Sequence, residues 1–530
     1  MIKNKTHKIT VVGGGSSGWM VAAGLVKYFP DRDITVIDSS KIPSIGVGES
    51  TTAMMRGFIV GHLGIDEKEF CKGTDAIWKA NVRFKDFSKI GEWFDYPIGM
   101  PFLNKSTNNS MGSMSTWNLK KFFYPETSHN DFIESHFPHY YLYNENKVSN
   151  NIDLDGMRPS VDYAYHLDAN KLGPFLKNYY CLPRGVKHID SEIKDINVSE
   201  HGIESVVLED GSLHESDLYI DCTGFKSLLL GQALKEEWVP LNEYLHNNRA
   251  WATPFDYKDK YKEMQPYTTA TALKNGWAWY TPIWSRIGNG YAYSDKHVSP
   301  EDALKEFKEH LMSDKLPIPR TKEEVENQKF IDLKMKTGYY KRNWVKNVVA
   351  IGLSAGFLEP LEGTGLLFVH NPLLVLCKFI SDEKVNQLQR DVYNKQLEED
   401  FKGWRDILSL FYIQSKRDDS QYWIDQISRE TKFDNANMFR FADALLRDNT
   451  NEHTDNMEAA LYITMGMGFG HDVGQWTYDR WNIWEDYFDW KPMVDLWIKE
   501  KDFMKEKWKM QSSKEPHVYD FFRKEVWGEK

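Results

Sequence analysis

A glycine-rich turn near the amino terminus has the composition of a phosphate-binding loop. It reads GGGSSG over residues 13–18, directly after the apolar run KITVV and directly before the helix-like run WMVAAGLVKYF. In such a loop Gly13 permits a tight turn, Gly15 lets the backbone approach a pyrophosphate, and Gly18 allows close helix packing. The helix start adds unpaired N–H groups and the positive end of its dipole. We expect a dinucleotide here, with an ordinary tight turn as the alternative.

An acidic residue ends the next strand-like run. ITVID finishes at Asp38, twenty residues after Gly18, where a carboxylate can accept hydrogen bonds from ribose hydroxyls. Strand, glycine turn, helix and a second strand with a terminal acid make a βαβ unit. FAD and a nicotinamide both remain open at this point. Further small-residue turns in IPSIGVGEST, DCTGFKSLL and IGLSAGFLEPLEGTG favour the extended FAD.

Two tryptophans stand one residue apart in GWAWYTPIW, residues 276–284. Because side chains alternate along an extended segment, Trp277 and Trp279 face the same side and form one apolar wall. This wall either separates two compartments or simply packs in the core.

The elements that must position these groups are those of an α/β protein. Strand-like runs recur at SVVLED, DLYIDCTG and NVVAIGL, each ending in residues suited to a ligand-facing loop. Helical stretches rich in charged and aromatic residues follow beyond residue 395. We expect a Rossmann-like FAD-binding module with interleaved substrate-site segments over residues 1–395, and a mostly helical substrate cap over residues 396–530.

The composition excludes several classes of partner. The chain of 530 residues has 77 acidic and 66 basic residues, a net charge of −11, and no basic stripe for nucleic acid.

Its four cysteines are too far apart in sequence for a disulfide framework or a zinc site, which fits a reducing compartment. The amino terminus has no signal-peptide core.

The longest apolar stretch, GLLFVHNPLLVLCKFI, is broken by His370, Asn371 and Pro372 and falls short of a membrane span. We therefore expect a cytoplasmic protein without a metal site, a nucleic-acid partner or a membrane anchor. A homo-oligomer remains open.

Seven segments together resemble the flavin-dependent halogenases of the tryptophan-halogenase family: VVGGGSSGWM, IPSIGVGEST, AIWKANVRF with Lys79, YHLDANKLGPFLK, IDCTGF, GWAWYTP and IGLSAGFLEPLEGTG. They are spread over about the first 370 residues, and the double-tryptophan and FLEPLE segments are the most specific. The resemblance implies a module of the class A flavin monooxygenase type. A member of viral or marine origin is one interpretation.

The resemblance also implies an enzyme with two sites. Reduced FAD, supplied by a separate flavin reductase, reacts with O2 to give a flavin hydroperoxide, and halide attack on its distal oxygen yields hypohalous acid. This acid passes through the protein to a lysine beside a small, electron-rich aromatic substrate, which is halogenated as an electrophilic substitution. The tryptophan wall then divides the flavin from the substrate.

Lys79 is the halogenating lysine that the resemblance implies. Pattern alone favours a solvated surface lysine, because Lys79, Asn81 and Arg83 alternate with apolar residues as on a strand with one polar face. In a closed tunnel its ammonium could donate a hydrogen bond to hypohalous acid. Desolvation would favour the neutral amine, which is the form that a haloamine requires. Glu362 matches the carboxylate of the family near this lysine, where it can polarise the halogen donor or take the proton that the substituted ring loses. Glu359 is the alternative, or only an anchor of the turn.

The halide ion, as chloride, bromide or iodide, is expected at the backbone N–H groups of Thr364 and Gly365, where the apolar helix LLFVHNPLLVL begins. Both residues are also ordinary at a helix start. The family usually has serine where this chain has Gly363. Because the lost side chain would leave more room, we expect bromide or iodide to be accepted alongside chloride.

The segment YPIGMPF holds Tyr96 and Ile98 roughly where tryptophan-specific members of the family sandwich the indole. The region between FADALLRDNT and NMEAALYITMG is short and polar, and it lacks the paired tyrosines with which those members clamp the amino acid. We therefore expect another indole or a phenol in place of free tryptophan. The residues assigned to FAD are Gly13, Gly15, Ser16, Ser17, Gly18, Asp38, Ser39, Ile42, Val47, Glu49, Ile189, Leu353 and Leu366.

Two other functions remain open from the sequence. A flavin aromatic monooxygenase would expose the substrate directly to the hydroperoxide and would need no halide. A non-enzymatic FAD-binding redox protein would not depend on Lys79.

Overall fold

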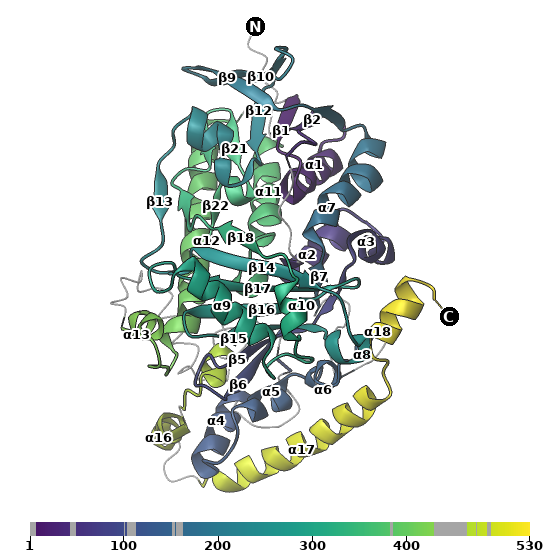
Figure 1. Cartoon of the computed structure of the whole chain (residues 1–530). Coiled ribbons are helices and arrows are strands. Elements are labelled where there is room, and N and C mark those ends of the chain that lie inside the picture. Colours follow the sequence, from purple (N-terminus) through teal and green to yellow (C-terminus); the bar gives the residue numbers. More distant parts are fainter. Residues whose placement is uncertain are drawn as a thin grey trace.

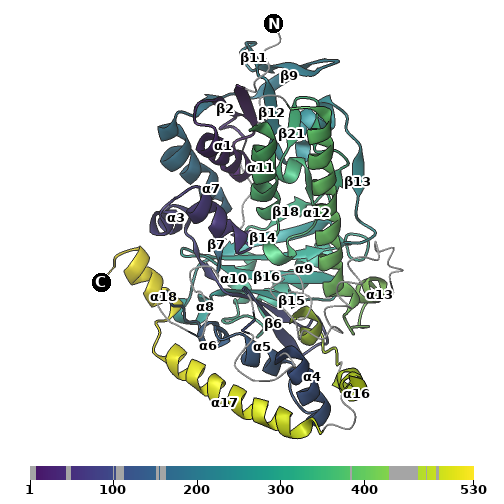
Figure 2. The ribbon, with the colours of Figure 1, turned by 180° about the vertical axis from the view of Figure 1, so that it is seen from behind.

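The computed structural model describes residues 7–42, 49–99, 101–102, 113–150, 154, 163–381, 385–428, 464–472, 474–484 and 489–529. A largely parallel sheet lies toward one end of the molecule and a larger antiparallel sheet lies in its middle (Figure 1). Helices line the opposite end, and the long helix α12 runs beside both sheets (Figure 2).

The first sheet has six strands in the order β20-β21-β12-β1-β2-β8, and all but β20 run parallel. Its strands are β1 (Lys8–Val12), β2 (Asp33–Asp38), β8 (Lys187–Asp190), β12 (Leu218–Asp221), β20 (Trp344–Val345) and β21 (Val348–Ala350). Helix α1 (Ser16–Tyr28) follows β1 and packs on α7 (Ala169–Phe175) and α11 (Leu367–Ile380). The strand, turn, helix and strand predicted over residues 8–38 are thereby confirmed.

The second sheet has seven strands in the order β18-β14-β17-β16-β15-β5-β6, antiparallel except for the β15–β5 pair. Its strands are β5 (Asn81–Lys85), β6 (Trp93–Pro97), β14 (Arg249–Phe255), β15 (Tyr267–Ala272), β16 (Gly276–Pro282), β17 (Ile287–Tyr293) and β18 (Ile331–Lys334).

Three small sheets complete the strands of the described residues. The sheet β3-β7-β4 holds Glu49–Ser50, Ala164–Leu167 and Ile77–Lys79. The sheet β13-β19-β22 holds Trp238–Pro240, Gly338–Tyr340 and Gly356–Phe357. The hairpin sheet β11-β10-β9 holds Leu213–Glu215, Gly202–Leu208 and Ile193–Ser199.

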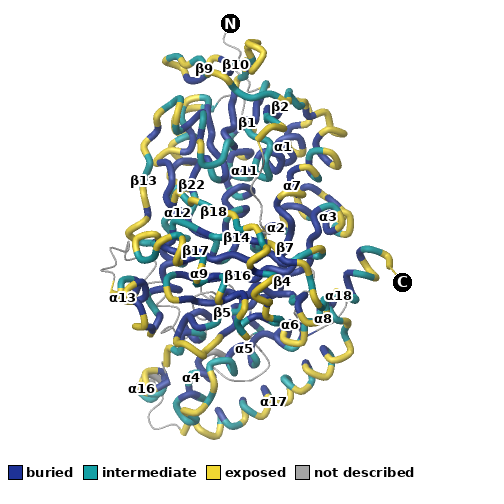
Figure 3. The backbone as a smooth tube through the Cα atoms, viewed as in Figure 1, coloured by how far each residue is buried: buried dark blue, intermediate teal, exposed yellow. Residues whose placement is uncertain are grey.

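The two faces of the seven-stranded sheet belong to different apolar cores. On one face Trp277 and Trp279 join the main core of the molecule. On the other face Tyr280 and Tyr291 pack with Phe307 in a second core under α9 (Pro300–Leu311) and α10 (Lys322–Glu326). Figure 3 shows that the strands of this sheet are mostly buried. The sheet is therefore a wall with protein on both sides.

Small residues make room for the two indoles on the main-core face. Trp277 lies between Ala272 and Ala292 in the strand register, and Trp279 lies beside Gly290. A Cβ at Gly290 would stand 1.9 Å from a ring carbon of Trp279, so the indole lies across the glycine backbone. The ring centroids of the two tryptophans are 5.8 Å apart. The shared face predicted from their spacing is confirmed.

Most of the remaining helices cover the sheets or form the far end of the molecule. Helix α12 (Gln387–Ile413) begins at a capping box between Asn386 and Gln389. At the far end α16 and α17 pack on α4, α5 and α6 (Figure 1). These and the remaining α-helices are α2 (Met54–Arg56), α3 (Glu67–Thr74), α4 (Ser113–Phe123), α5 (Asn130–His136), α6 (Tyr140–Tyr143), α8 (Lys260–Glu263), α13 (Gln421–Ile427), α16 (Gly474–Trp484), α17 (Lys491–Ser513) and α18 (Val518–Phe521).

Two sequence expectations about these elements need correction. SVVLED was expected to end at a ligand-facing loop, but it belongs to β10, which pairs antiparallel with β9 and β11 in a hairpin sheet. A short apolar run has the same pattern in either kind of sheet, so the sequence could not separate them. Helix α12 also runs unbroken through residue 395, so the helical part begins earlier than expected. The division into two domains stays a prediction.

The apolar stretch around α11 is longer than we expected. Leu361–Ile380 is long and apolar enough to cross a membrane by length and composition, with a mean hydropathy of 1.5. His370 and Pro372 lie inside α11 and do not interrupt it. However, 61% of the most apolar part is buried inside the protein, and α11 packs on α1. Because core helices pass the same length and composition test, this stretch is weak evidence for a membrane span.

Substitution of Gly290 by alanine tests how closely Trp279 packs. We expect Gly290→Ala to lower the free energy of unfolding by about 1–3 kcal/mol, because the new methyl group overlaps the indole. Denaturant titration measures this loss. Gly403→Ala in α12 is the matched control, since a Cβ there meets no atom within 4 Å and alanine favours a helix. Equal losses in the two variants would contradict the packing described here.

Candidate active site

The glycine turn between β1 and α1 has the shape and the space that a pyrophosphate requires. Gly13 has a φ of 105°, and a Cβ there would lie 2.3 Å from the carbonyl oxygen of Cys222. A Cβ at Gly18 would lie 1.8 Å from the carbonyl oxygen of Gly13, whereas a Cβ at Gly15 would meet nothing within 4 Å. Gly15 is the N-cap of α1 and provides no side-chain cap. The turn therefore fits an anionic group at the helix start.

Asp38 lies directly against this turn. A Cβ at Gly14 would collide with its carboxylate, 1.8 Å from Oδ2. The other oxygen, Oδ1, pairs with Nε2 of His188 on the neighbouring strand β8. The acid predicted from its spacing thus stands at the carboxyl end of β2, beside the carboxyl end of β1, where ligands of parallel sheets bind.

The two serines of the turn have structural partners. The Ser16 hydroxyl donates to the carbonyl oxygen of Ala169 over 2.9 Å and so anchors α7 to the turn. Ser17 lies against Gly352, because a Cβ built at Gly352 would be 2.6 Å from the Ser17 Oγ. Because Gly352 starts the short helical turn Gly352–Ser354, Leu353 also lies near the start of α1.

The other residues assigned to FAD are spread around the same edge of the sheet. Ser39 and Ile42 lie in the turn after β2, and Ile189 is paired with Ile37 on the neighbouring strand. Leu366 is the buried N-cap of α11.

Two expectations fall outside the described residues, and a third concerns a side chain that the structure does not describe. Val47 and the cap region between FADALLRDNT and NMEAALYITMG lie there entirely, and Glu49 is described only by its backbone in β3. These assignments stay predictions.

Lys79 is buried, not solvated. It ends β4, its side chain is only 2% exposed, and its Nζ donates to the carbonyl oxygen of Thr51 over 3.1 Å. The polar alternation with Asn81 does not mark an exposed face, because the chain passes from one sheet to another at Ala80, whose N–H donates to the Pro266 carbonyl. The surface-lysine alternative is therefore wrong.

Thr51 is held in place by Tyr165 on β7. The Thr51 N–H donates to the Tyr165 carbonyl over 2.9 Å, and the Tyr165 N–H donates to the Thr51 hydroxyl oxygen over 2.9 Å. The hydroxyl in turn donates to the Tyr165 carbonyl over 3.1 Å. These bonds fix the carbonyl that accepts from Lys79. Sequence reasoning missed this residue, although it lies in the quoted segment IPSIGVGEST.

Glu362 lies close enough to Lys79 for each charge to act on the other. Burial lowers the pKa of the Lys79 amine to about 8, although the Glu362 carboxylate favours its protonated form. Burial likewise raises the pKa of Glu362 to about 7, against the pull of the Lys79 charge. Oε1 of Glu362 has no hydrogen-bond partner in the described part of the chain. The pair therefore combines an amine and a carboxyl group whose pKa values are both shifted toward neutral pH.

Glu359 differs from Glu362 in its partners. Its two side-chain oxygens accept from the Tyr412 hydroxyl and the Asn247 amide, and Tyr422 donates to Asn247 in turn. This buried network ties the segment to α12 and α13. Of the two glutamates left open by the sequence, the geometry favours Glu362 for proton transfer and Glu359 as an anchor.

The extra room expected at Gly363 is absent. Gly363 has a φ of 67°, and a Cβ there would lie 2.3 Å from the carbonyl oxygen of Ser50. The space beside this glycine is filled by the backbone of β3, which the sequence could not show. The argument for larger halides from added space is therefore wrong.

Thr364 and Gly365 follow this turn and precede α11. The Thr364 carbonyl accepts from the Phe368 N–H in the first turn of that helix. The predicted halide-binding groups are thus at a helix start, beside Glu362 in sequence.

Tyr96 and Ile98 lie next to the strand that follows Lys79. The Ile98 N–H donates to the Ala80 carbonyl over 2.9 Å. Tyr96 is buried, and its ring meets Phe411 edge to face at 5.7 Å. Because Ala80 directly follows Lys79, this bond places Ile98 beside the strand of the lysine. Tyr96 lies further along β6.

Sequence reasoning also missed a chain of buried, hydrogen-bonded polar side chains near Lys79. Nε2 of His166 pairs with the Thr268 hydroxyl oxygen over 2.8 Å, and Thr268 donates to the Ser50 hydroxyl over 3.1 Å. Burial, together with the charge of Lys79, lowers the pKa of His166 well below its usual value. The segment YHLDANKLGPFLK contains His166, but nothing in its pattern indicated this position.

The carboxyl-terminal segment braces the strand that carries Lys79. Trp78 packs against Phe521 of α18, with ring centroids 4.8 Å apart. Trp284, just beyond the tryptophan strand β16, stacks on Trp527 at 4.1 Å. One segment near the chain end therefore contacts both the lysine strand and the end of the tryptophan strand.

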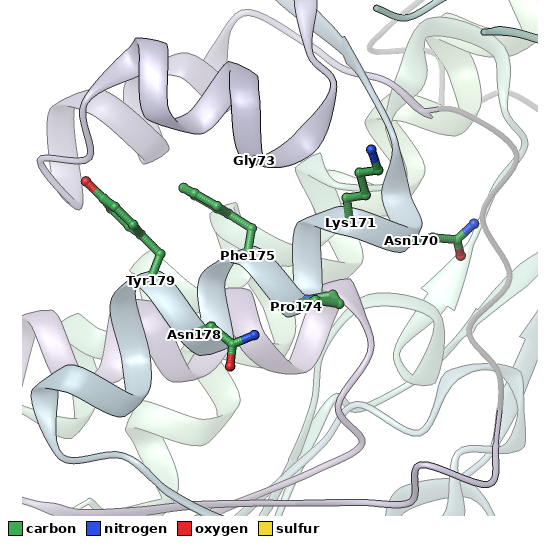
Figure 4. A pocket seen from close by; sticks show the side chains of 7 residues that line it. All are labelled: Gly73, Asn170, Lys171, Pro174, Phe175, Asn178 and Tyr179. Atoms are coloured by element: carbon green, nitrogen blue, oxygen red, sulfur yellow. The ribbon is translucent and has the colours of Figure 1, made fainter. Parts of the chain in front are cut away.

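A surface pocket lies apart from these residues. It has a volume of about 320 Å³ and lies between α3 and the helical segment that begins with α7 (Figure 4). Its lining includes Phe175 and Tyr179, whose rings stack, and Lys171, which pairs with Asp75. None of the predicted site residues lines it, so it is not the candidate active site.

A family model described as tryptophan halogenase matches residues 8–470. The chain belongs to the tryptophan halogenase family. Its members are flavin-dependent halogenases, and this chain is an enzyme that uses FADH2, O2 and a halide ion. Such enzymes need a separate flavin reductase and an aromatic substrate. The mixed α/β fold with substantial helical content is confirmed.

Curated relatives and solved structures agree with this assignment. The tryptophan 6-halogenase ThaL of Streptomyces albogriseolus is 30% identical over 432 residues, covering 79% of this chain and 78% of that protein. The 7-chloro-L-tryptophan 6-halogenase KtzR of Kutzneria sp. (strain 744) is 33% identical over 438 residues, covering 79% of this chain and 82% of that protein.

Among solved structures, VirX1 in its apo form has a TM-score of 0.87 and 32% identity, covering 99% of this chain and 100% of that chain. The tryptophan 6-halogenase SttH of Streptomyces toxytricini has a TM-score of 0.82 and 28% identity, covering 97% and 99%. These comparisons do not bear out a viral or marine origin.

The buried pair predicts a minimum in the pH dependence of stability. The pKa of Lys79 is lower in the folded state, so unfolding takes up a proton between about pH 8 and 10.5 and stability rises with pH there. The pKa of Glu362 is higher in the folded state, so stability falls as pH rises from 4.5 to about 7. The contribution of the pair to the free energy of unfolding is therefore lowest between pH 7 and 8.

The double variant Lys79→Met/Glu362→Gln removes both charges and tests this minimum. We expect it to be more stable than the wild type by about 1–4 kcal/mol between pH 7 and 8, with a smaller difference at lower and higher pH. Urea titrations across the pH range measure the difference. Lys72→Met, at an exposed lysine of α3, is the control. A difference independent of pH would contradict the burial of the pair.

Proposed function

We propose that this protein halogenates a small, electron-rich aromatic molecule at Lys79, with hypohalous acid made at a separate flavin site. The observation that carries the proposal is the buried Lys79 amine, bonded to the Thr51 carbonyl and acting on the charge of Glu362. Desolvation opposes the charge of this lysine and favours the neutral amine that a haloamine requires.

FAD in its reduced form, when bound with O2 and a halide ion, supplies hypohalous acid. The residues that would hold it are the glycine turn, with open space at Gly15, and Asp38. The N–H groups of Thr364 and Gly365 would bind the halide ion. Trp277 and Trp279, whose buried indoles adjoin on the main-core face of their sheet, would keep the flavin apart from the substrate.

Lys79 can receive hypohalous acid in two forms. As an ammonium it donates a hydrogen bond to the oxygen of the acid and makes the halogen more electrophilic. As a neutral amine, it forms a bond from Nζ to the halogen while the oxygen–halogen bond breaks, and the departing hydroxide takes a proton from nitrogen to leave as water. A pKa of about 8 makes both forms accessible near neutral pH.

Glu362 is suited to the last step. When the ring attacks the halogen, the substituted carbon must lose a proton. A carboxylate whose pKa is raised to about 7 is a stronger base than an ordinary one, and Oε1 has no partner in the described residues that would compete for that proton.

The substrate that we propose is an indole or a phenol other than free tryptophan. The curated relatives are named as tryptophan halogenases. The support for a different substrate is the sequence of the cap, which lacks the paired tyrosines, together with Ile98 beside the lysine strand. Bromide or iodide alongside chloride also stays a prediction, as do a cytoplasmic location and the absence of nucleic-acid and membrane partners.

Substitution of Lys79 by alanine tests the proposed function. We expect Lys79→Ala to abolish ring halogenation while FAD still binds, since the glycine turn is unchanged. The assay supplies reduced FAD, O2, mixed halides and a panel of indoles, including free tryptophan, and phenols, with products identified by mass spectrometry. Flavin absorbance after gel filtration measures FAD binding.

Two results would overturn the proposal. Halogenation that persists in Lys79→Ala, with Lys72→Ala as the matched control, would show that Lys79 is not required. Wild-type turnover without halide that yields a hydroxylated ring would identify a monooxygenase instead.

A further inference from the structure

His166 lies beside Lys79 on the same face of their small sheet. His166 on β7 pairs with Ile77 on β4, and Lys79 comes two residues later on β4. Because side chains alternate along a strand, His166 and Lys79 are diagonal neighbours on one side of the sheet. Both strands are buried (Figure 3), and the charge of Lys79 acts on the His166 ring. The proposed reaction at Lys79 and Glu362 does not use this histidine.

The His166 ring begins a chain of hydrogen bonds that ends at Ser50. The Thr268 hydroxyl has one proton, which it donates to the Ser50 hydroxyl over 3.1 Å. Its oxygen therefore accepts from Nε2 of His166 over 2.8 Å, so Nε2 carries the ring proton. Thr268 shares its face of β15 with Ala270, which pairs with Trp279. The chain thus lies on the tryptophan face of the seven-stranded sheet.

Ser50 connects this chain to both members of the buried pair. Its carbonyl oxygen would lie 2.3 Å from a Cβ built at Gly363, which directly follows Glu362. The next residue, Thr51, accepts from the Lys79 amine over 3.1 Å through its carbonyl. A shift of the segment 50–51 would therefore move the acceptor of Lys79 and the backbone beside Glu362 together.

Two sets of bonds hold the segment 50–51 in different directions. The bonds between Thr51 and Tyr165 attach it to β7. The bond between Ser50 and Thr268 attaches it to β15, which belongs to the other sheet. Loss of the second bond would leave the segment held on one side only.

The position of His166 suits an uncharged donor. Burial, and then the charge of Lys79, lower the pKa of His166 well below its ordinary value, so the ring is neutral. A lysine or an arginine here would place a second positive charge beside the Lys79 ammonium and oppose its protonation. A neutral imidazole supplies a donor without this repulsion.

We propose that His166 is a positioning residue for the reaction at Lys79. Through Thr268 and Ser50 it fixes the segment that holds the Lys79 amine. The same segment lies against the turn that carries Glu362. The inference rests on the proposed function and adds a residue on which that reaction depends.

Ring halogenation by variants of the full chain measures this role. His166→Leu removes the donor, and Thr268→Val removes the hydroxyl that follows it. We expect each to lower kcat by about tenfold to a hundredfold, with KM for the substrate changed by less than about threefold, because a misplaced amine impairs the reaction more than binding. His166→Gln places an amide N–H near the position of Nε2 and should recover most of the rate.

A double variant tests whether the two residues act as one chain. Because either substitution breaks the same chain, His166→Leu/Thr268→Val should lose no more than about twofold beyond the single variants. His310→Leu and Thr271→Val are the matched controls and should keep the wild-type rate. His310 is a buried histidine of α9, and Thr271 is buried on the opposite face of β15 from Thr268.

The Lys79 amine provides a measurement that does not depend on turnover. With the Thr51 carbonyl less firmly held in His166→Leu, the ammonium loses part of its acceptor, so NMR titration should give a pKa below the wild-type value of about 8. Circular dichroism and FAD binding confirm that each variant folds, and Thr268→Val serves for the same titration if His166→Leu does not fold.

Four results would overturn the inference: wild-type kcat in His166→Leu, no recovery in His166→Gln, losses that multiply in the double variant, or an unchanged pKa of Lys79. A wild type that halogenates none of the substrates would contradict the proposed function instead. The titration of Lys79 would still decide whether His166 positions the amine.

Discussion

The burial of one lysine amine is the constraint on which the rest of the structure depends. Lys79 is removed from water at the end of the short edge strand β4, and its amine is held by the Thr51 carbonyl. A buried ammonium is costly because it loses its hydration. Two groups stabilise its charge, the fixed carbonyl of Thr51 and the carboxylate of Glu362. The same desolvation that opposes the charge lowers the pKa of the amine to about 8.

The fold joins this lysine to Glu362 and to the tryptophan strand through paired backbone. The strand β3 pairs with the same central strand as β4, and its Ser50 carbonyl lies against Gly363 next to Glu362. The strand after Lys79 enters the sheet that carries Trp277 and Trp279. Lysine, carboxylate, helix start and tryptophan wall are therefore parts of one packed framework, as the proposed transfer of an oxidant between two sites would require.

The residues that could be predicted from sequence are those whose role follows from local backbone need. Gly13, Gly15 and Gly18 have the conformation, the open space and the close approach that their spacing indicates. The burial of Lys79 could not be predicted, because its alternating pattern continues across a change of sheet. The filled space at Gly363 could not be predicted either, since Ser50 comes from a segment more than three hundred residues away.

The pKa of the Lys79 amine tests the account most directly. It can be measured by NMR titration of protein with labelled lysine side chains, with the resonance assigned by its loss in Lys79→Arg. The account predicts a pKa of about 8, which falls further in Glu362→Gln because the carboxylate favours the ammonium. An amine that titrates near the ordinary lysine value, unchanged by that substitution, would contradict it.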